Sequence, residues 1–454
     1  MADRENFGSR IAVITALVGS AIGLGNIWRF PYMLGEHGGG AFILVYVLAT
    51  LLVSLPVFVA EVMIGRRSGI NARDSFNVLA PGKPFWKAIG ILTIIIPTII
   101  ASYYSVIGGW SIEYFVKSCG MAFSNMAPDE AEGIFGNFIS RPWAPVITHL
   151  VFLFLSVLVV AFGVNSGIGR FSKAAIPVLF VLILVIIGYS LSLPGAGAGV
   201  RYLFKPDLSQ LTPTTFAYAM GQSFYSLSLG MGIIITYSSY MSRKENILFS
   251  SGVTAVSDLG FAILAGLAIM PAVFAAGIEP GAGPGLIFQS IPFIFCKMSA
   301  ELPVLSSIIS LVFFLAIIVA AMTSCISLVE VGTAFIVERF RICRPVAAAI
   351  IFVICGSLGT LCSLSFGPLK DFTIAGKTIF DLLDWFTSNI LLLIMAFMAV
   401  IFVGFVMRKD DVRDEFTNSG ALRKDGRLFG VFYFLIKWVA PIALVLIFIS
   451  NFIL

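Results

Sequence analysis

The residues best suited to chemistry lie in one stretch near the N-terminus, Gly-Ser-Ala-Ile-Gly-Leu-Gly-Asn-Ile-Trp-Arg-Phe-Pro at 19–31. Three glycines, an asparagine and an arginine interrupt an apolar run that would otherwise form a membrane-spanning helix. Glycine weakens helical backbone, and in hydrocarbon an exposed peptide group costs several kcal/mol unless another group binds it. A break here predicts a partner for those groups, and an ion or a polar substrate is the obvious candidate.

A second stretch of the same kind is Gly-Gln-Ser-Phe-Tyr-Ser-Leu-Ser-Leu-Gly-Met-Gly at 221–232. Half-helix N-termini carry partial positive charge and freed carbonyls partial negative charge, so the first suit a carboxylate and the second suit Na⁺. A zwitterionic amino acid together with sodium would satisfy both sets. Close packing of small residues is the alternative explanation for Gly19 and Gly23, but it leaves Asn26 and Arg29 unexplained.

The rest of the chain predicts an all-α polytopic membrane protein. Hydrophobic residues make up 59% and charged residues 12% of 454 positions, whereas soluble proteins carry about 25% charge. Continuous apolar runs of roughly 20 residues are typical of spanning helices. We count eleven predicted spans, at about 11–35, 41–66, 87–116, 144–162, 170–191, 214–240, 248–275, 302–338, 346–364, 382–407 and 429–452.

The two interrupted spans are the first and the sixth. Five spans separate the start of the first interrupted span from the start of the second, so the sixth span enters the membrane from the opposite side. The pattern therefore predicts two inverted five-helix repeats, at about 11–191 and 214–407. The segment 429–452 is then an extra span, and 1–454 forms a single transmembrane domain. Alternate loops are rich in lysine and arginine, which predicts a cytoplasmic N-terminus and, with eleven spans, a C-terminus outside. The net charge of +5 therefore reflects membrane topology and indicates no nucleic-acid partner.

These motifs resemble the bacterial branch of the neurotransmitter:sodium symporter family over nearly the whole chain. The stretch at 19–31, Gly-Gly-Gly-Ala-Phe at 38–42 and Ser-Leu-Ser-Leu-Gly-Met-Gly at 226–232 carry the resemblance, with Ala-Ser-Tyr-Tyr at 101–104 and Ala-Ala-Met-Thr-Ser at 320–324. The resemblance implies broken first and sixth helices, a bacterial plasma-membrane location and sodium-coupled amino-acid uptake by alternating access.

The resemblance also implies two sodium sites. The first would use the Ala21 carbonyl, the Asn26 amide oxygen, Ser226, Asp258 and the substrate carboxylate, so that ion and substrate depend on each other. The second would use five oxygens from spans one and eight, contributed by the carbonyls of Gly19, Ile22 and Ala320 and the hydroxyls of Thr323 and Ser324. Hydroxyls that bond back to the preceding helical turn are the alternative for the last two residues.

Asp258 is an acid in mid-span, which indicates a functional site in its own right. Animal members of the family need chloride near the first sodium, and a fixed carboxylate could replace it, so we expect chloride-independent transport. Whether Asp258 also returns a proton outward stays open.

The substrate pocket implied by the resemblance is apolar and lacks an opposing charge, which favours neutral hydrophobic L-amino acids, aromatic ones included. Its expected residues are Ala21, Gly25, Ile100, Tyr104, Tyr225, Ser226, Ser228, Met231, Ser324 and Leu328. Two charge pairs would gate the pocket: Arg29 with Asp384 outside, and Arg4 with Glu338 inside, the latter braced by Tyr240. Solvated terminal residues are the alternative for the inner pair.

No nucleophile–base pair, metal cluster or phosphate loop is visible in the sequence, so an enzyme is disfavoured. Two other classes stay open: a channel-like protein and a substrate sensor with the same fold. The sequence leaves the oligomeric state and the role of Glu330 undetermined.

Overall fold

The computed structural model describes residues 5–124, 126, 128–280, 286–299, 302–418, 420 and 426–453. This part of the chain is helical, with a single isolated bridge between Ile374 and Lys377 and no strand. The all-α prediction is therefore confirmed for the described residues.

The first half of the chain runs from α1 to α10, with short 3-10 or π segments labelled η. These elements are α1 (Arg10–Ala21), η1 (Gly25–Arg29), α2 (Phe30–Glu36), α3 (Gly40–Ala49), η2 (Thr50–Ser54), α4 (Leu55–Ser68), α5 (Ala72–Leu79), α6 (Pro84–Cys119), η3 (Ala122–Ser124), α7 (Pro128–Ile139), α8 (Ala144–Ala161), η4 (Val164–Gly169), α9 (Arg170–Ser192) and α10 (Ala196–Phe204).

The second half begins at the second polar stretch. Its elements are η5 (Leu208–Gln210), α11 (Pro213–Ser226), α12 (Ile233–Ser238), α13 (Ile247–Ala276), α14 (Ser290–Ser299), α15 (Pro303–Phe340), α16 (Arg344–Leu364), α17 (Ile379–Phe386), η7 (Thr387–Leu391), α18 (Leu392–Ile401), η8 (Phe402–Val406), α19 (Lys409–Phe416), α20 (Gly426–Phe434), η9 (Leu435–Val439) and α21 (Ala440–Ile453).

Nine helical stretches of the described chain are long and apolar enough to cross a membrane, namely 40–68, 84–119, 144–161, 164–192, 247–276, 303–340, 344–364, 379–406 and 427–453. A tenth candidate is the pair Arg10–Ala21 and Gly25–Glu36, which is bent by 44° at its break. The sixth predicted span is divided into α11 and α12, separated by residues 227–232. The count of eleven and the inverted repeat remain predictions.

Local sequence signals set several helix ends. Thr212 and Thr215 form a capping box at the start of α11, and Asn246 accepts a hydrogen bond from the Phe249 amide at the start of α13. Such caps satisfy amide groups that lack a partner within the helix. At the other end of α13, Gly277 takes a left-handed conformation with φ of +73°, which glycine adopts without strain.

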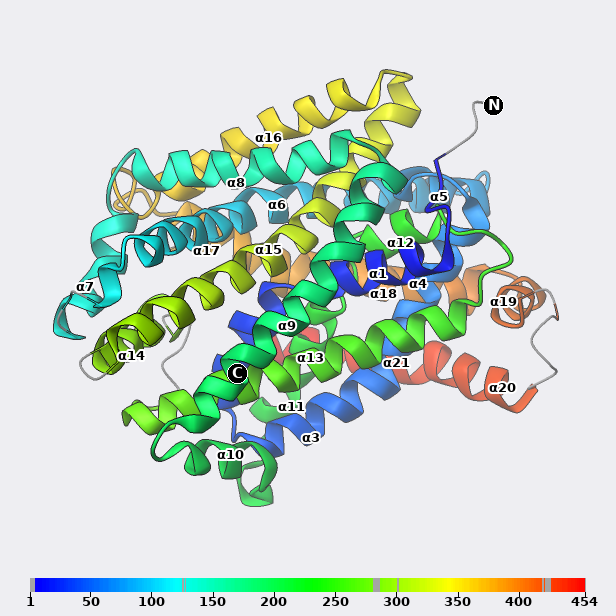
Figure 1. Ribbon diagram of the computed structural model, residues 1–454. Helices are drawn as coiled ribbons and strands as arrows, with labels where there is room; N and C mark the ends of the chain where they lie inside the picture. The colour runs from blue at the N-terminus through cyan, green and yellow to red at the C-terminus, as the bar shows by residue number, and fades with distance from the viewer. Residues whose placement is uncertain are drawn as a thin grey trace.

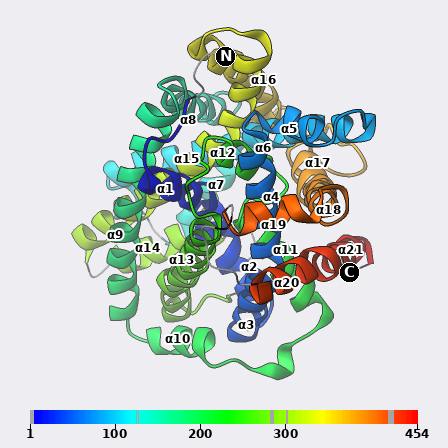
Figure 2. The ribbon, with the colours of Figure 1, turned by 90° about the vertical axis from the view of Figure 1, so that its right-hand side faces the viewer.

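The long helices form a bundle around the two broken ones. Figure 1 shows α8 and α16 along one side, α3, α10 and α21 toward the other, and α1, α13 and α15 between them. In the turned view of Figure 2, α1 and α12 lie inside the ring of longer helices. Helix α6 packs against α8, α15 and α16, while α1 packs against α9, α13 and α15. The two breaks therefore meet in the interior.

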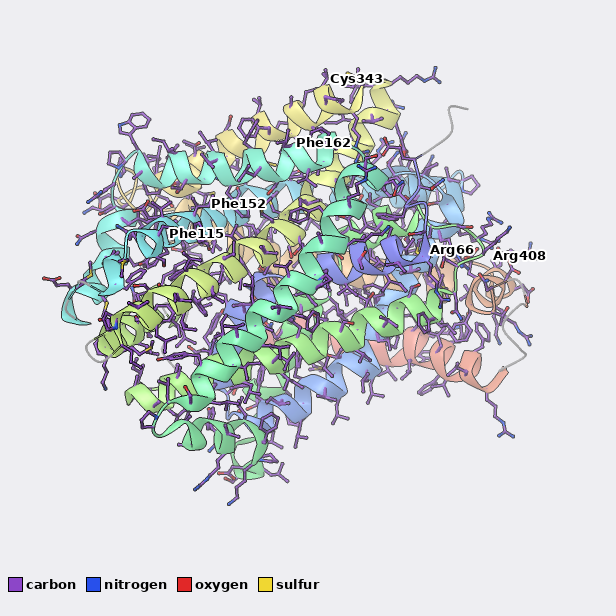
Figure 3. The ribbon with its side chains drawn as sticks, in the orientation of Figure 1. Arg66, Phe115, Phe152, Phe162, Cys343 and Arg408 are labelled. Carbon is purple, nitrogen blue, oxygen red and sulfur yellow. The ribbon has the colours of Figure 1, made fainter. Side chains whose placement is uncertain are left out.

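Positive charge gathers at one end of the bundle. Figure 3 shows Arg66 and Arg408 at the end where α19 and α20 meet, and Phe115 toward the opposite end. The positive-inside rule predicts that the arginine-rich end faces the cytoplasm.

Candidate functional site

Two interruptions of helical backbone form the centre of the candidate site. Helix α1 ends at Ala21, Ile22 is extended with φ −74° and ψ 106°, and η1 begins at Gly25. Between α11 and α12, Ser228, Gly230 and Gly232 have φ values of +56°, +75° and +71°. Positive φ is strained for most side chains and not for glycine, so the two glycines make this reversal possible.

Three side chains hold the interruptions in place. The Ser228 hydroxyl donates to the Ser20 carbonyl at 2.8 Å, and Gln222 Nε2 donates to the Gly25 carbonyl at 2.9 Å. The fully buried Glu61 of α4 accepts the Gly230 amide through Oε1 at 2.8 Å. These bonds satisfy backbone groups that the missing helical turns leave unpaired.

Our sequence reasoning did not single out Glu61. The signal was present, because an acid inside an apolar span is a functional candidate by default. What the sequence did not reveal is its partner, an amide 169 residues away.

A cavity of about 330 Å³ lies between the interruptions and helices α6 and α15. All ten residues expected at the substrate pocket line this cavity, with Ser20, Gly23 and Ile233 in addition. Its apolar walls come from Ile100, Met231, Ile233 and Leu328, and no charged side chain is among the lining residues.

The polar end of the cavity lies at the break in the first helix. Tyr104 Oη accepts the Leu24 amide at 3.2 Å and also lies within hydrogen-bond reach of the Ser324 side chain. A Cβ atom on Gly23 would overlap the Ser324 hydroxyl and lie 3.1 Å from Tyr104 Oη. An alanine here would therefore force the Ser324 side chain to shift at the polar end of the cavity.

Residues of the first predicted sodium site come together around Asp258 of α13, which is fully buried. Asn26 Nδ2 lies 2.7 Å from Asp258 Oδ1 and 3.1 Å from Ser226 Oγ. The Ser226 hydroxyl lies 2.8 and 2.9 Å from the two carboxylate oxygens, and the Tyr46 hydroxyl lies 3.3 Å from Asp258 Oδ2. The Asn26 amide oxygen, which is the atom expected to bind sodium, instead accepts the Gly23 amide at 3.0 Å, so this side chain would have to turn over to bind a cation. The oxygens of Ser226 and Asp258 suit a hard cation as they stand.

Residues of the second predicted site also converge. The Thr323 hydroxyl donates to the carbonyls of Ile22 at 3.0 Å and Ala320 at 2.8 Å. An ideal Cβ atom on Gly19 would lie 3.6 Å from Thr323 Cβ. Within the described chain, no residue that follows α1 donates a hydrogen bond to the carbonyls of Gly19 or Ala21. Of the three carbonyls expected at the second site, those of Ile22 and Ala320 accept the Thr323 hydroxyl, and only that of Gly19 has no such partner in the described chain. Carbonyl oxygens of this kind suit Na⁺.

The predicted outer gate is only partly assembled. Arg29 stacks over the Tyr225 ring, with its guanidinium carbon 4.6 Å from the ring centroid. Asp384 instead accepts the Ser388 hydroxyl at 3.2 Å, and no ion pair joins Arg29 to Asp384 among the described side chains. The pairing of these two residues remains a prediction.

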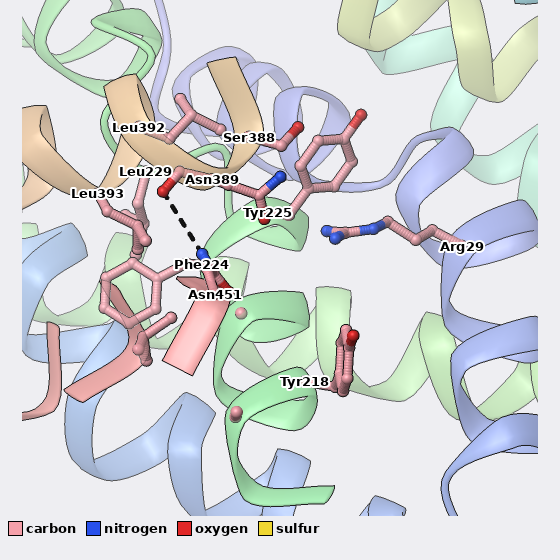
Figure 4. A pocket seen from close by; sticks show the side chains of 13 residues that line it. Arg29, Tyr218, Phe224, Tyr225, Leu229, Ser388, Asn389, Leu392, Leu393 and Asn451 are labelled. Atoms are coloured by element: carbon pink, nitrogen blue, oxygen red, sulfur yellow. Dashed lines mark hydrogen bonds between the residues drawn. The ribbon is translucent and has the colours of Figure 1, made fainter. Parts of the chain in front are cut away.

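A second cavity, of about 500 Å³, lies beyond Tyr225 and Arg29. In Figure 4, Arg29 points toward Tyr225, while Asn389 and Asn451 are joined by a hydrogen bond at 3.4 Å. Tyr225 lines both cavities. The Arg29–Tyr225 contact therefore forms a wall between the two spaces.

At the arginine-rich end, an ionic network surrounds Glu330 of α15. Glu330 accepts the Tyr240 hydroxyl at 2.6 Å and forms an ion pair with Arg344. Arg344 also lies 3.5 Å from Glu5. Phe7 packs edge-on against Tyr240, with ring centroids 5.9 Å apart. The network joins the N-terminal segment to the turn after α12, to α15 and to α16.

The predicted inner gate lies beside this network. Glu338 accepts the backbone amide and the side-chain amide of Asn71 at 2.9 and 2.7 Å. Arg4, its expected partner, lies outside the described residues.

Comparisons with known proteins place this geometry in a family. The model of the sodium:neurotransmitter symporter family matches residues 4–127 and 139–454. An uncharacterized sodium-dependent transporter of Bacillus subtilis is 36% identical over 98% of this chain and 97% of its own length. A similar protein of Haemophilus influenzae is 34% identical over 99% and 98%.

A solved structure is similar along the whole chain. The crystal structure of MhsT in complex with L-phenylalanine superposes with a TM-score of 0.89 at 39% identity, covering 99% of this chain and 100% of that one. Together with the apolar helices, these matches make the chain a multi-pass membrane protein that transports a small molecule with sodium and is not an enzyme. The chain belongs to the sodium:neurotransmitter symporter family.

Proposed function

We propose that this transporter carries neutral hydrophobic L-amino acids, aromatic ones included, into the bacterial cell across the plasma membrane together with sodium. The observation that carries the proposal is the uncharged 330 Å³ cavity between the two helix breaks. A charged side chain would lose its hydration there without gaining an opposite charge. The L-phenylalanine bound in the similar MhsT structure supports the same substrate class.

The polar end of the cavity supports recognition of the amino-acid backbone. The Tyr104 hydroxyl and the Gly25 amide would donate to a carboxylate, whereas the Leu24 amide already donates to Tyr104 Oη, and the helix dipole favours negative charge at that point. Carbonyls near Tyr225 and Ser228 would accept the ammonium group. Met231 and Leu328 would enclose the side chain, and methionine adapts to side chains of different shape.

Two sodium ions would accompany each substrate. Ala21, Asn26, Ser226 and Asp258 would hold the first ion beside the substrate carboxylate. The second would lie among Gly19, Ile22, Ala320, Thr323 and Ser324. Because the Asp258 carboxylate supplies a fixed negative charge at the first site, transport would not require chloride.

Alternating access would use the two ends of the site in turn. The Arg29–Tyr225 wall closes the cavity from the 500 Å³ space, and Asp384 would draw Arg29 into an ion pair when that space closes. At the other end, the contacts of Glu330, Tyr240 and Glu338 would have to part to release substrate into the cytoplasm.

The test is uptake of labelled leucine into proteoliposomes that hold an inward sodium gradient. We expect saturable uptake that stops when potassium replaces sodium, with tyrosine, tryptophan and phenylalanine competing. Preferred transport of glycine or lysine would contradict the substrate class. Sodium-dependent binding without uptake would favour a sensor, and flux that does not saturate would favour a channel.

A further inference from the structure

A groove far from the substrate cavity lies where α19 meets α20 and η9. Three basic side chains line it: Lys409, Arg413 and Lys437. Four aromatic side chains line it as well: Phe429, Tyr433, Phe434 and Trp438. Figure 1 shows α19 and α20 at the edge of the arginine-rich end of the bundle.

Helix α19 divides its charges between two faces. Toward α4, Glu415 binds the buried Arg66 at 2.6 Å and Asp411 binds Arg67 at 2.6 Å. Lys409 and Arg413, one helical turn apart, lie on the groove side instead. The acids of α19 are thus mostly used within the protein, and its cations are left at the surface.

The three groove cations have no acidic partner in the described part of the chain. Lys437 Nζ lies 5.0 Å from the centroid of the Phe405 ring and 5.6 Å from that of Tyr433. Lys409 Nζ lies 5.4 Å from the same tyrosine ring. Asp410 is the one acid among the lining residues, so three positive charges against one negative leave an excess of two. The groove therefore attracts an anion.

The groove continues into an apolar surface. Val431 is 56% exposed, Phe434 58% and Trp438 53%, and these residues lie on a stretch long and apolar enough to span a membrane. Tryptophan and tyrosine prefer the level of lipid headgroups, and lysine side chains reach toward that level from within a span. A ligand that fits has an anionic head and apolar tails.

We propose that this groove binds an anionic phospholipid of the surrounding leaflet. Its phosphate lies among Lys409, Arg413 and Lys437, and its acyl chains follow the exposed face of α20 and η9. The proposal concerns a lipid site apart from the transported substrate and does not depend on which amino acid is carried.

The test reconstitutes the full chain in phosphatidylcholine vesicles that contain an equal mole fraction of either dibrominated phosphatidylglycerol or dibrominated phosphatidylcholine. Bromine quenches nearby tryptophan, and the difference between wild-type and Trp438→Phe fluorescence isolates Trp438. We expect stronger quenching by phosphatidylglycerol. We define the preference as the ratio of the affinity for phosphatidylglycerol to that for phosphatidylcholine, obtained from the quenching of Trp438. It should fall at least about tenfold in the triple variant Lys409→Gln/Arg413→Gln/Lys437→Gln, because each basic side chain near an anionic surface strengthens binding several-fold.

The matched control is Lys83→Gln/Lys87→Gln/Lys173→Gln, which removes the same charge from exposed positions elsewhere and should keep the preference. Equal quenching by both lipids in the wild type, or an equal loss in both triple variants, overturns the proposal. If millimolar glycerol phosphate relieves the quenching, the groove takes a soluble anion and the lipid assignment is wrong. Retention of phosphatidylglycerol by the purified protein in native mass spectrometry provides a second measurement that does not depend on Trp438.

Discussion

At the scale of single residues, Asp258 carries the sharpest consequence of the candidate site. Its carboxylate is completely buried and is surrounded by Asn26, Ser226 and Tyr46. A buried charge of this kind requires compensation, and a cation is the natural source. Removing the charge leaves the first sodium site short of one negative group.

Asp258→Asn should therefore make transport depend on chloride. In proteoliposomes with gluconate as the only anion, we expect initial uptake to fall at least about tenfold, which corresponds to about 1.4 kcal/mol. Chloride should restore part of it in the variant and change nothing in the wild type. Asp371→Asn, at an exposed position, is the control. Wild-type uptake that collapses in gluconate would contradict chloride independence.

Gly23→Ala tests the polar end of the cavity. The added methyl group overlaps the Ser324 hydroxyl and crowds Tyr104, and overpacking of this kind costs about 1–3 kcal/mol. Scintillation proximity binding of labelled leucine in sodium should be at least about tenfold weaker, since 1.4 kcal/mol is a factor of ten. Gly252→Ala, where the new methyl meets open space, should bind normally. Equal binding by both variants would remove Gly23 from the ligand site.

At the scale of elements, the buried Arg66 is one of the links between α19 and the rest of the protein. Arg66 of α4 binds the Glu415 carboxylate at 2.6 Å, and it also reaches the Glu245 carbonyl and the Asn418 side chain at 2.7 and 2.8 Å. Both members of the ion pair are buried. The arginine thus links α4, the turn before α13 and α19.

Arg66→Met should destabilise the protein by about 3–5 kcal/mol, because it leaves Glu415 buried without its main partner. The measurement is denaturant unfolding in detergent. Arg66→Met/Glu415→Met should recover a large part of the loss, since no buried charge is then unpaired. Lys117→Met, which breaks the partly exposed Lys117–Glu113 pair, should cost less than about 1 kcal/mol. A double variant as unstable as the single one would argue against this coupling.

The elements also show what sequence reasoning could reach. Each predicted span coincides with helical stretches to within a few residues. Membrane spans can be predicted from short sequence windows, because their length and apolar composition are set by the thickness of the bilayer. Both breaks were predicted for the same reason, since glycine and polar residues inside an apolar run are local signals. The short helices α5, α10 and α19 were missed, because each is far shorter than the roughly 20 apolar residues by which a membrane span is recognised.

Long-range pairings were harder to predict. Glu61 with Gly230, Glu330 with Arg344 and Arg66 with Glu415 join different segments of the chain. A single sequence does not show which segments come into contact. The ten pocket residues were reachable because the family resemblance carried the contacts with it. Their roles in binding stay predictions until measured.

At the scale of the whole molecule, orientation in the membrane can be tested with native cysteines. Among the six, Cys119 and Cys343 are exposed and the other four are buried. Cys119 ends α6, and Cys343 lies between α15 and α16 at the arginine-rich end (Figure 3). The predicted topology puts Cys119 outside and Cys343 in the cytoplasm.

A maleimide that cannot cross membranes should therefore label Cys119 in intact cells and Cys343 only in inside-out vesicles. Cys119→Ser and Cys343→Ser identify which thiol reacts. The reverse pattern would invert the orientation of the chain and with it the proposed direction of transport.

The position of Tyr225 as a common wall has one more consequence. A compound whose side chain fits within the substrate cavity would allow the Tyr225 ring to close over it and would be transported. A longer compound that occupies both cavities would hold the Tyr225 ring open and would stop the transport cycle. Among chemically similar ligands, length alone would then separate cargo from inhibitor.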